Sequence, residues 1–334
     1  MEDSCAGIFP SAERVREALE IGRFSLCCRP MRCLFFLGLL LLTACTSAQQ
    51  TLYDVGRNAE RRGAGLDAQA VDTPLGEVAY LEREAPGPTV VLLHGFGANK
   101  DNWLRFAPHL PDSLHVVALD MLGHGESAYH PDSTYGVPRL VDGVRAAVDA
   151  LGITRFHLAG NSLGGLVATR LALAAPERVA SLFLLDPAGV EPPEPSPYRE
   201  ALADGENPLI PQTAAGYDSL MALAFNDPPD LPWPAGDVLA RQYAERAPIN
   251  RQIWRDINDP PLIVTDELPD LSVPAFLLFG ADDRIIDPSS AEVWAEQVPD
   301  LRVVLLPDVG HAPMLEAPRT TARYYLDFLR RVTP

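Results

Sequence analysis

The chain has 334 residues, of which 47% are apolar and 22% are charged. This is the composition of a globular protein of one or two domains with a large buried core, and it excludes disorder and a collagen-like repeat as descriptions of the whole chain. The formal net charge of -18 excludes binding to nucleic acid through a basic face.

The N-terminal segment has the pattern of an export signal. All five cysteines lie in the first 45 residues, so the remainder of the chain can hold neither a disulfide nor a cysteine metal site. The uncharged run at 33–42 follows two arginines, and its ten residues suit the h-region of a signal peptide but are too few to cross a bilayer as a helix. Met31 would make a normal start, so 1–30 is interpreted as an upstream extension. We therefore predict that 1–44 comprises an N-terminal extension and a signal peptide.

The h-region ends in the sequence LTAC at Leu42–Cys45, and a polar stretch follows. This box resembles the lipobox of bacterial lipoproteins, in which the cysteine thiol is lipidated and becomes the first residue of the mature protein. The resemblance implies lipidation of Cys45 and an exported protein that is anchored to a membrane. Ordinary signal-peptide cleavage near Ala48 is the alternative, and it would leave the protein periplasmic or secreted.

The remainder of the chain predicts alternating strands and helices. Residues 45–75 are expected to form a tether and an amphipathic helix at 51–62, and the alternating segment 76–82 an outer strand. Short apolar runs without alternation follow, as is typical of strands buried on both faces. They are Thr89–Leu93, His115–Leu119, Phe156–Ala159, Ser181–Leu185, Ala275–Phe279 and Arg302–Leu306. Helical patterns between most of them, at 138–151, 163–175, 288–298 and 318–331, predict an α/β fold with a mostly parallel sheet and helices on both faces.

One long interval breaks this alternation. Residues 187–270 contain no comparable apolar run, and they hold fifteen of the 32 prolines. A structureless loop of this length is uncommon in a compact domain. Helical patterns inside the interval cover 212–226 and 236–256. We therefore predict a core of residues 76–187 and 271–334 that carries an inserted helical cap of residues 188–270.

The strongest chemical signal is the segment Gly160-Asn161-Ser162-Leu163-Gly164, which follows one predicted strand and opens a predicted helix. A G-x-S-x-G nucleophile elbow requires this context, although the bare motif also occurs in ordinary glycine-rich turns. The sharp turn holds the serine in a strained conformation, and the two glycines lack the Cβ atoms that would collide there. We predict that Ser162 is a nucleophile whose hydroxyl lies at the positive end of the following helix.

A serine hydroxyl needs a base, and the imidazole that serves as base needs a carboxylate to orient it. His311 is the candidate base because it follows the last predicted strand after a short loop, whereas the other six histidines lie in helices, strands, surface positions or glycine-bounded turns. Asp282 and Asp283 both follow the second-to-last strand, and Asp287 is a more distant candidate. The chain order of serine, aspartate and histidine is that of α/β-hydrolases.

The third component of such a site is an oxyanion hole. A glycine-flanked loop at 94–97, with the sequence HGFG, follows the strand predicted at 89–93. Such a loop supplies one backbone N–H to the developing oxyanion, and the residue after the nucleophile supplies the second. We therefore assign the oxyanion hole to the main-chain N–H groups of Phe96 and Leu163. A flexible turn is the alternative interpretation of HGFG alone.

Residues 75–333 resemble the α/β-hydrolase superfamily. The resemblance rests on the motifs HGFGANKDNW, DMLGHGES, GNSLGG, GADDRIID and VGHAPMLE. Their combination is most similar to bacterial lipases and esterases related to the membrane-associated monoacylglycerol lipase of animal cells. In the family pattern G-x-x-D-R the catalytic acid precedes the arginine, which implies Asp283 and not Asp282. The resemblance also implies a structural role for Asp120, which would accept hydrogen bonds from N–H groups of a turn.

The resemblance implies hydrolysis of carboxylic esters, in particular acylglycerols or other lipid-like esters, through an acyl-enzyme and with no metal and no organic cofactor. The expected partners of the protein are an ester or lipid substrate and, through the anchor, a membrane. The resemblance implies no particular oligomeric state. Haloalkane dehalogenases and epoxide hydrolases use a carboxylate nucleophile, so Ser162 argues against both. Carbon–carbon bond hydrolases of this fold share the elbow, but they have tryptophan directly after the catalytic histidine, where this chain has Ala312. A cofactor-free haloperoxidase or a catalytically idle ligand-binding member of the same fold would also be compatible with these motifs.

Overall fold

The computed structural model describes residues 29–332. The chain divides into two compact units, Met1–Leu52 and Tyr53–Pro334. Most of the predicted N-terminal extension, residues 1–28, lies outside the described residues. Helix α2 (Arg29–Gly63) contains the predicted h-region, the LTAC box and the predicted helix at 51–62 in one element. The helix predicted at 51–62 is thus part of a longer helix, because no proline interrupts the chain between the LTAC box and residue 51. Within residues 29–332, no helix has an apolar stretch long enough to cross a membrane.

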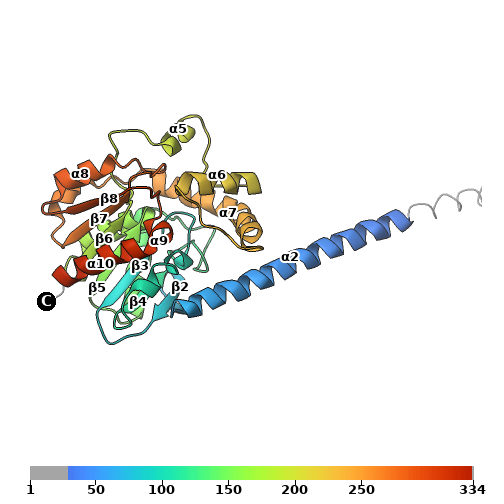
Figure 1. The fold of residues 1–334 in the computed structure, drawn as a ribbon, viewed down its shortest axis with the longest axis horizontal. Coiled ribbons are helices and arrows are strands. Elements are labelled where there is room, and N and C mark those ends of the chain that lie inside the picture. The colour runs from blue at the N-terminus through green and yellow to red at the C-terminus, as the bar shows by residue number, and fades with distance from the viewer. Residues whose placement is uncertain (1–28, 333–334) are drawn as a thin grey trace, which may run out of the picture. The chain divides into compact units, whose positions relative to one another are not determined.

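The second unit is built on an eight-stranded sheet of order β1-β2-β4-β3-β5-β6-β7-β8 (Figure 1). The strands are β1 (Asp67–Thr73), β2 (Gly76–Arg83), β3 (Thr89–Leu93), β4 (His115–Leu119), β5 (Phe156–Asn161), β6 (Val179–Leu185), β7 (Ala275–Gly280) and β8 (Arg302–Leu306). Strand β2 pairs antiparallel with both β1 and β4, and the strands from β3 to β8 are mutually parallel. The predicted fold class is confirmed, while β1 is an addition whose aspartates and alanines are residues depleted in strands.

Alternate residues of the strands supply two separate hydrophobic layers. In β3, Val91 and Leu93 belong to the layer formed with helices α3 (Val137–Ala150), α4 (Leu163–Ala174) and α8 (Ser290–Gln297). Val90 and Leu92 belong to the opposite layer, with α10 (Pro318–Val332) and the short helices η1 (Lys100–Trp103) and η2 (Ala107–His109). Helices therefore cover both faces, as the apolar runs predict. Strand β8 differs because it lies at the sheet edge, where Leu305 is exposed.

Four helical elements lie between β6 and β7: α5 (Pro197–Ala203), α6 (Ala214–Ala224), α7 (Ala235–Asn258) and η3 (Thr265–Asp270). Figure 1 shows α6 and α7 side by side, and the rings of Tyr217 and Tyr243 pack between them at 5.2 Å. Helix α7 is also attached to the loop after β4, since Tyr129 Oη donates to Gln252 Oε1 at 2.6 Å. The sequence pattern did not predict α5. The division into core and cap at residues 188 and 270 stays a prediction.

Candidate active site

The turn between β5 and α4 holds Ser162 in a strained conformation, with φ 55° and ψ -120°. Few residues other than glycine adopt a positive φ without an energetic cost. A Cβ atom on Gly160 would lie 2.3 Å from the carbonyl oxygen of Gly164, and one on Gly164 would lie 2.5 Å from the carbonyl oxygens of Leu93 and His94. These distances are too short for any side chain. The two glycines therefore permit the close approach of strand, turn and helix that the motif predicts.

The backbone of Ser162 is hydrogen-bonded through both its N–H and its carbonyl. Its N–H donates to the carbonyl of Leu185 at 3.0 Å, and its carbonyl accepts from the N–H of Ala188 at 3.1 Å. Leu185 is the last residue of β6, the strand next to β5, and Ala188 lies in the segment that follows β6. Since Ser162 immediately precedes α4, its hydroxyl lies at the positive end of the helix dipole.

The structure brings Asp283 and His311 together. Asp283 Oδ2 lies 2.7 Å from His311 Nδ1, and Asp283 Oδ1 accepts from the N–H groups of Ile285 at 2.7 Å and Ile286 at 3.1 Å. The side chain of Asp283 is buried, whereas Asp282 is exposed. The geometry thus pairs the histidine with the aspartate that the family pattern selects.

The loop that carries His311 is clamped between two other elements. The His311 carbonyl accepts a hydrogen bond from Asn161 Nδ2 at 2.9 Å, and the His311 N–H donates to the carbonyl of Ala224 in α6 at 2.8 Å. Asn161 is the residue before Ser162, so one side chain connects the serine turn to the histidine loop. Sequence reasoning did not assign Asn161 a role, and the motif position directly before the serine was the only signal for it.

The predicted oxyanion loop lies against Ser162. A Cβ atom on Gly95 would be 3.2 Å from Ser162 Cβ, and Phe96 lines the same pocket as Ser162. Leu163 is the first residue of α4, so its N–H has no acceptor within the helix. His94 Nε2 accepts from the Met121 N–H at 3.1 Å, so its proton lies on Nδ1, which donates to the Gly95 carbonyl at 2.7 Å. Burial lowers the pKa of His94 to about 4, which makes it a neutral structural residue.

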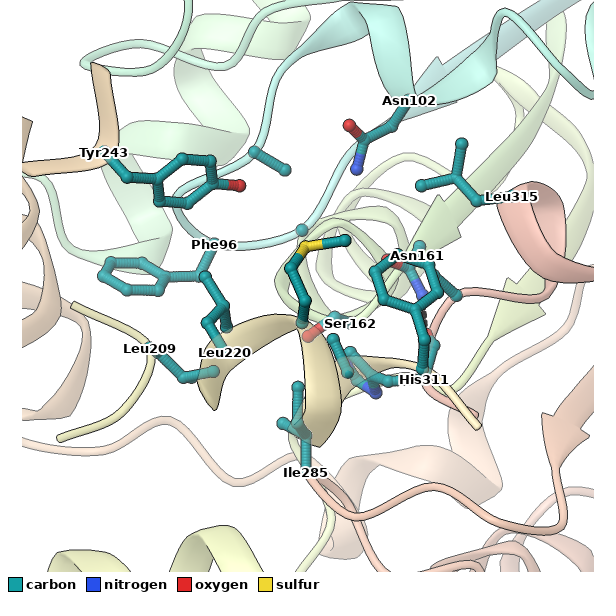
Figure 2. Close-up of a pocket in the computed structure, with 16 residues that line it drawn as sticks. Phe96, Asn102, Asn161, Ser162, Leu209, Leu220, Tyr243, Ile285, His311 and Leu315 are labelled. Atoms are coloured by element: carbon teal, nitrogen blue, oxygen red, sulfur yellow. Dashed lines mark hydrogen bonds between the residues drawn. The ribbon is translucent and has the colours of Figure 1, made fainter. Parts of the chain in front are cut away.

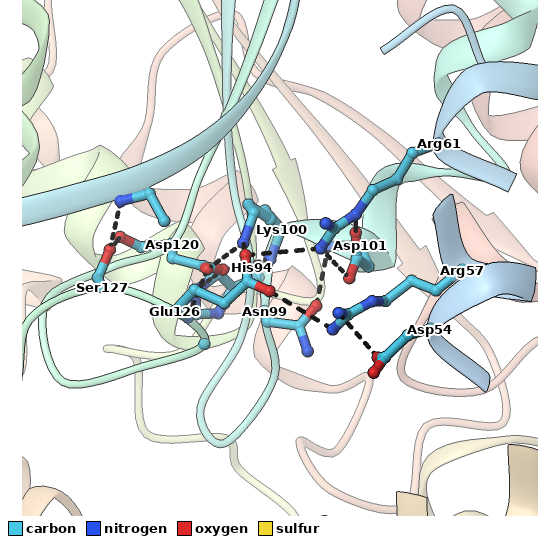
Figure 3. Close-up of polar contacts among 12 residues, drawn as sticks. Asp54, Arg57, Arg61, His94, Asn99, Lys100, Asp101, Asp120, Glu126 and Ser127 are labelled. Carbon is cyan, nitrogen blue, oxygen red and sulfur yellow. Dashed lines mark hydrogen bonds and ion pairs between the residues drawn. The ribbon is translucent and has the colours of Figure 1, made fainter. Parts of the chain in front are cut away.

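A buried ion pair supports the end of this loop (Figure 3). Lys100 is the only lysine in the chain and is 1% exposed. Its backbone N–H and its Nζ each donate to Asp120 at 2.6 Å, and Nζ also donates to Glu126 at 2.7 Å. A buried charge is tolerated only when it is paired in this way. Asp120 therefore has the structural environment expected for it, with the N–H of Glu126 as a further donor at 2.8 Å. Sequence reasoning assigned Lys100 no structural role, although a single lysine among arginines was a visible signal.

Ser162 and His311 open into a pocket of about 100 Å³ (Figure 2). Its walls are mostly apolar and come from the β3 loop, from Ile285 and from the helices between β6 and β7. Figure 2 shows Leu220 of α6 and Tyr243 of α7 on the side of the pocket near Phe96. One apolar pocket is therefore lined by both a strained serine and a carboxylate-bound imidazole.

A family profile of the alpha/beta hydrolase fold matches residues 88–318. The chain belongs to the α/β-hydrolase family. It is 31% identical over 285 residues to monoacylglycerol lipase abhd6-B of Xenopus laevis, covering 80% of this chain and 84% of that protein. It is 27% identical over 303 residues to Lipase 3 of Moraxella sp. (strain TA144), covering 86% and 94%. The crystal structure of a membrane phospholipase A, a novel bacterial virulence factor, is similar with a TM-score of 0.84 and 39% identity over 89% of this chain and 98% of that one. The predicted resemblance to lipases and monoacylglycerol lipases is confirmed.

Proposed function

We propose that this α/β-hydrolase cleaves the ester bonds of lipid-like substrates through an acyl-enzyme on Ser162. The observation that carries the proposal is the position of Ser162 and His311 in one apolar pocket, with the His311 imidazole 2.7 Å from the buried Asp283 carboxylate. The chain is a carboxylic ester hydrolase, the class to which its relatives named lipase and phospholipase belong. Acylglycerols and related ester lipids are the substrates that fit the apolar walls.

The mechanism follows from which nitrogen of His311 is occupied. Asp283 accepts a hydrogen bond from the Nδ1–H group of His311, so Nε2 is unprotonated and able to take the proton of Ser162 Oγ. The serine then attacks the ester carbonyl, and the protonated imidazole gives its proton to the departing alcohol. Water attacks the acyl-enzyme by the reverse route and frees the carboxylic acid.

The main-chain N–H groups of Phe96 and Leu163 are the proposed donors to the tetrahedral oxyanion. Backbone donors need no reorganisation as the negative charge develops, and each contributes about 3 kcal/mol of transition-state stabilisation. The positive end of α4 acts in the same direction. Lys100 and Asp120 hold the end of the Phe96 loop in place and take no part in proton transfer.

The same proposal places the enzyme at a membrane surface. The LTAC box supports lipidation of Cys45, and export would follow from the predicted signal at 1–44. Two or three acyl chains hold a protein to a bilayer far more firmly than one, at about 0.8 kcal/mol per buried methylene. Ester lipids are abundant at such a surface, so anchor and substrate class are consistent with each other.

The test compares Ser162→Ala with Ser219→Ala, which removes an exposed hydroxyl of α6. We expect the first variant to lose at least a thousandfold in kcat on p-nitrophenyl esters and the second to match wild type. Mass spectrometry of the quenched enzyme should find the acyl group on Ser162. Activity of Ser162→Ala within tenfold of wild type would refute the proposed nucleophile.

A second assay compares esters of graded acyl length with substrates of carbon–carbon bond hydrolases and of haloperoxidases. It distinguishes ester hydrolysis from the other two reactions known for this fold. Medium-chain esters should be better substrates than acetate, because each buried methylene contributes about 0.8 kcal/mol. Cleavage of a carbon–carbon bond or peroxide-dependent halogenation without ester turnover would favour the related enzymes of this fold. Binding of an ester without turnover would indicate an idle ligand-binding member.

A further inference from the structure

A second buried aspartate lies beside the Asp283–His311 pair. Asp186 directly follows β6, has a φ of 45° and is fully buried. Its Oδ1 accepts from the Gly280 N–H at 2.7 Å. Its Oδ2 is equally buried, yet it has no hydrogen-bond partner among the described residues. A buried carboxylate oxygen without a donor is costly, so this atom requires an explanation.

The explanation is given by its neighbours. One carboxylate oxygen of Asp186, one of Asp283 and one ring nitrogen of His311 lie within 4.8 Å of one another. Two ionised carboxylates that share a buried site repel each other, so one of them holds a proton. Asp283 accepts two backbone hydrogen bonds and faces the imidazole, whereas Asp186 accepts a single backbone hydrogen bond. The surroundings therefore favour the negative charge on Asp283 and the proton on Asp186.

The charges around Asp186 act in the same direction. Burial raises the pKa of Asp186 well above its usual range, and the negative charges of Asp283 and of the more distant Glu316 raise it further. The Gly280 N–H opposes this shift. His311 is the remaining titratable group of the cluster, and its Nδ1 proton is already directed at Asp283.

We propose that Asp186 is a positioning residue, whose protonated carboxyl donates a hydrogen bond to Asp283 and thereby holds that carboxylate in place against His311. The inference rests on the proposed triad and adds a residue that no motif contains. Asp186 touches no substrate in this arrangement. It acts through Asp283, so it should affect kcat and leave KM unchanged.

Two substitutions at this position separate the hydrogen bond from the backbone. Asp186→Asn keeps a donor toward Asp283 and an acceptor for the Gly280 N–H, and asparagine tolerates a positive φ. Asp186→Gly adopts the same φ but removes the donor. We expect kcat of the Asn variant within about threefold of wild type, and a loss of about tenfold or more for the Gly variant, as for one hydrogen bond to a charged group. Asp300→Gly is the matched control, since Asp300 is exposed and has a φ of 58°.

The pH profile supplies a measurement that a purely structural role would not change. When Asp186 ionises at high pH, the donor is lost and two carboxylates repel each other, so wild-type kcat should fall. The Asn variant cannot ionise, and its profile should lack that alkaline limb. This comparison remains decisive if the Gly variant does not fold.

The outcomes distinguish this inference from the proposed function. If Ser162→Ala is inactive while Asp186→Gly equals wild type, or if the wild-type and Asn profiles coincide, the role of Asp186 is refuted and the triad stands. If Asn loses as much kcat as Gly, the hydrogen-bond argument is also wrong. If Ser162→Ala remains active, the proposed function itself fails.

Discussion

Replacement of Asp283 by asparagine should disable the enzyme without removing a single backbone contact. Asp283 Oδ1 accepts from the N–H groups of Ile285 and Ile286. An asparagine must direct its oxygen at those two donors, and its NH₂ group then faces His311 Nδ1. Two donors cannot bond to each other, so the imidazole moves its proton to Nε2, the nitrogen that must accept the proton of Ser162.

The expected loss in kcat follows from this change of tautomer. In serine hydrolases the equivalent change costs about ten-thousandfold in kcat, which corresponds to about 5.5 kcal/mol of transition-state stabilisation. The loss should appear in kcat and not in KM, because neither Asp283 nor His311 Nδ1 contacts bound ester. The thermal midpoint should change little, since the isosteric side chain keeps both backbone hydrogen bonds.

The assay is steady-state hydrolysis of a p-nitrophenyl ester by Asp283→Asn, with Asp282→Asn as the matched control. Asp282 is exposed and adjacent in sequence, so its substitution controls for charge and for local perturbation. We expect the control to retain wild-type kcat. A larger loss from Asp282→Asn, or a loss below tenfold from Asp283→Asn, would refute the assignment of the acid.

Three further predictions concern the serine turn, the buried carboxyl and the anchor. Gly164→Ala places a methyl group 2.5 Å from the carbonyl oxygens of Leu93 and His94 at the end of β3. Helix α4 must then move about 1 Å away from these carbonyls, so kcat should fall about a hundredfold, and unchanged kcat would contradict the packing argument. Asp186→Asn should have a higher thermal midpoint than wild type at pH 8. A carboxyl whose pKa is raised by folding stabilises the fold below about pH 4, and this stabilisation is lost as the pH rises, so the two midpoints should converge in acid. Equal midpoints of wild type and Asp186→Asn at pH 8 would argue that Asp186 is not neutral. Expression of the full gene in a bacterial host should yield a mature N-terminus at Cys45 that carries lipid; an unmodified N-terminus beyond residue 45 with soluble activity would exclude the anchor and leave the triad untouched.

The core strands could be predicted because strands buried on both faces consist mainly of apolar residues. Each parallel strand from β3 to β7 is covered on both faces, so its sequence is a continuous apolar run, and predicted and observed boundaries differ by at most two residues. Strand β1 has no such run, because most of its side chains are exposed and it pairs only with β2. Helix α5 was missed because it begins at Pro197 within a proline-rich segment, where its N-cap Ser196 is the only clear signal.

The side chains that sequence reasoning missed depend on neighbours distant along the chain. The pairing of Lys100 with Asp120 spans 20 residues and follows from the parallel alignment of β3 and β4. No local pattern near either residue predicts that contact. The names of the relatives agree with the predicted ester hydrolysis, whereas the triad, the oxyanion donors and the lipidation of Cys45 stay predictions.

Strand order explains why Asp186 was missed while Ser162 and Asp283 were found. Strands β5, β6 and β7 are neighbours, with Asn161 beside Leu185 and Leu185 beside Leu278 in register. Residues that directly follow these strands must therefore meet at one edge of the sheet. A motif identifies the residue after β5 and another the turn after β7, but no motif marks the residue after β6. Once the order of the sheet is known, the aspartate that directly follows β6 is seen to lie beside Asp283 and His311. The pH profiles of wild type and Asp186→Asn would then measure how far its proton supports the Asp283 carboxylate.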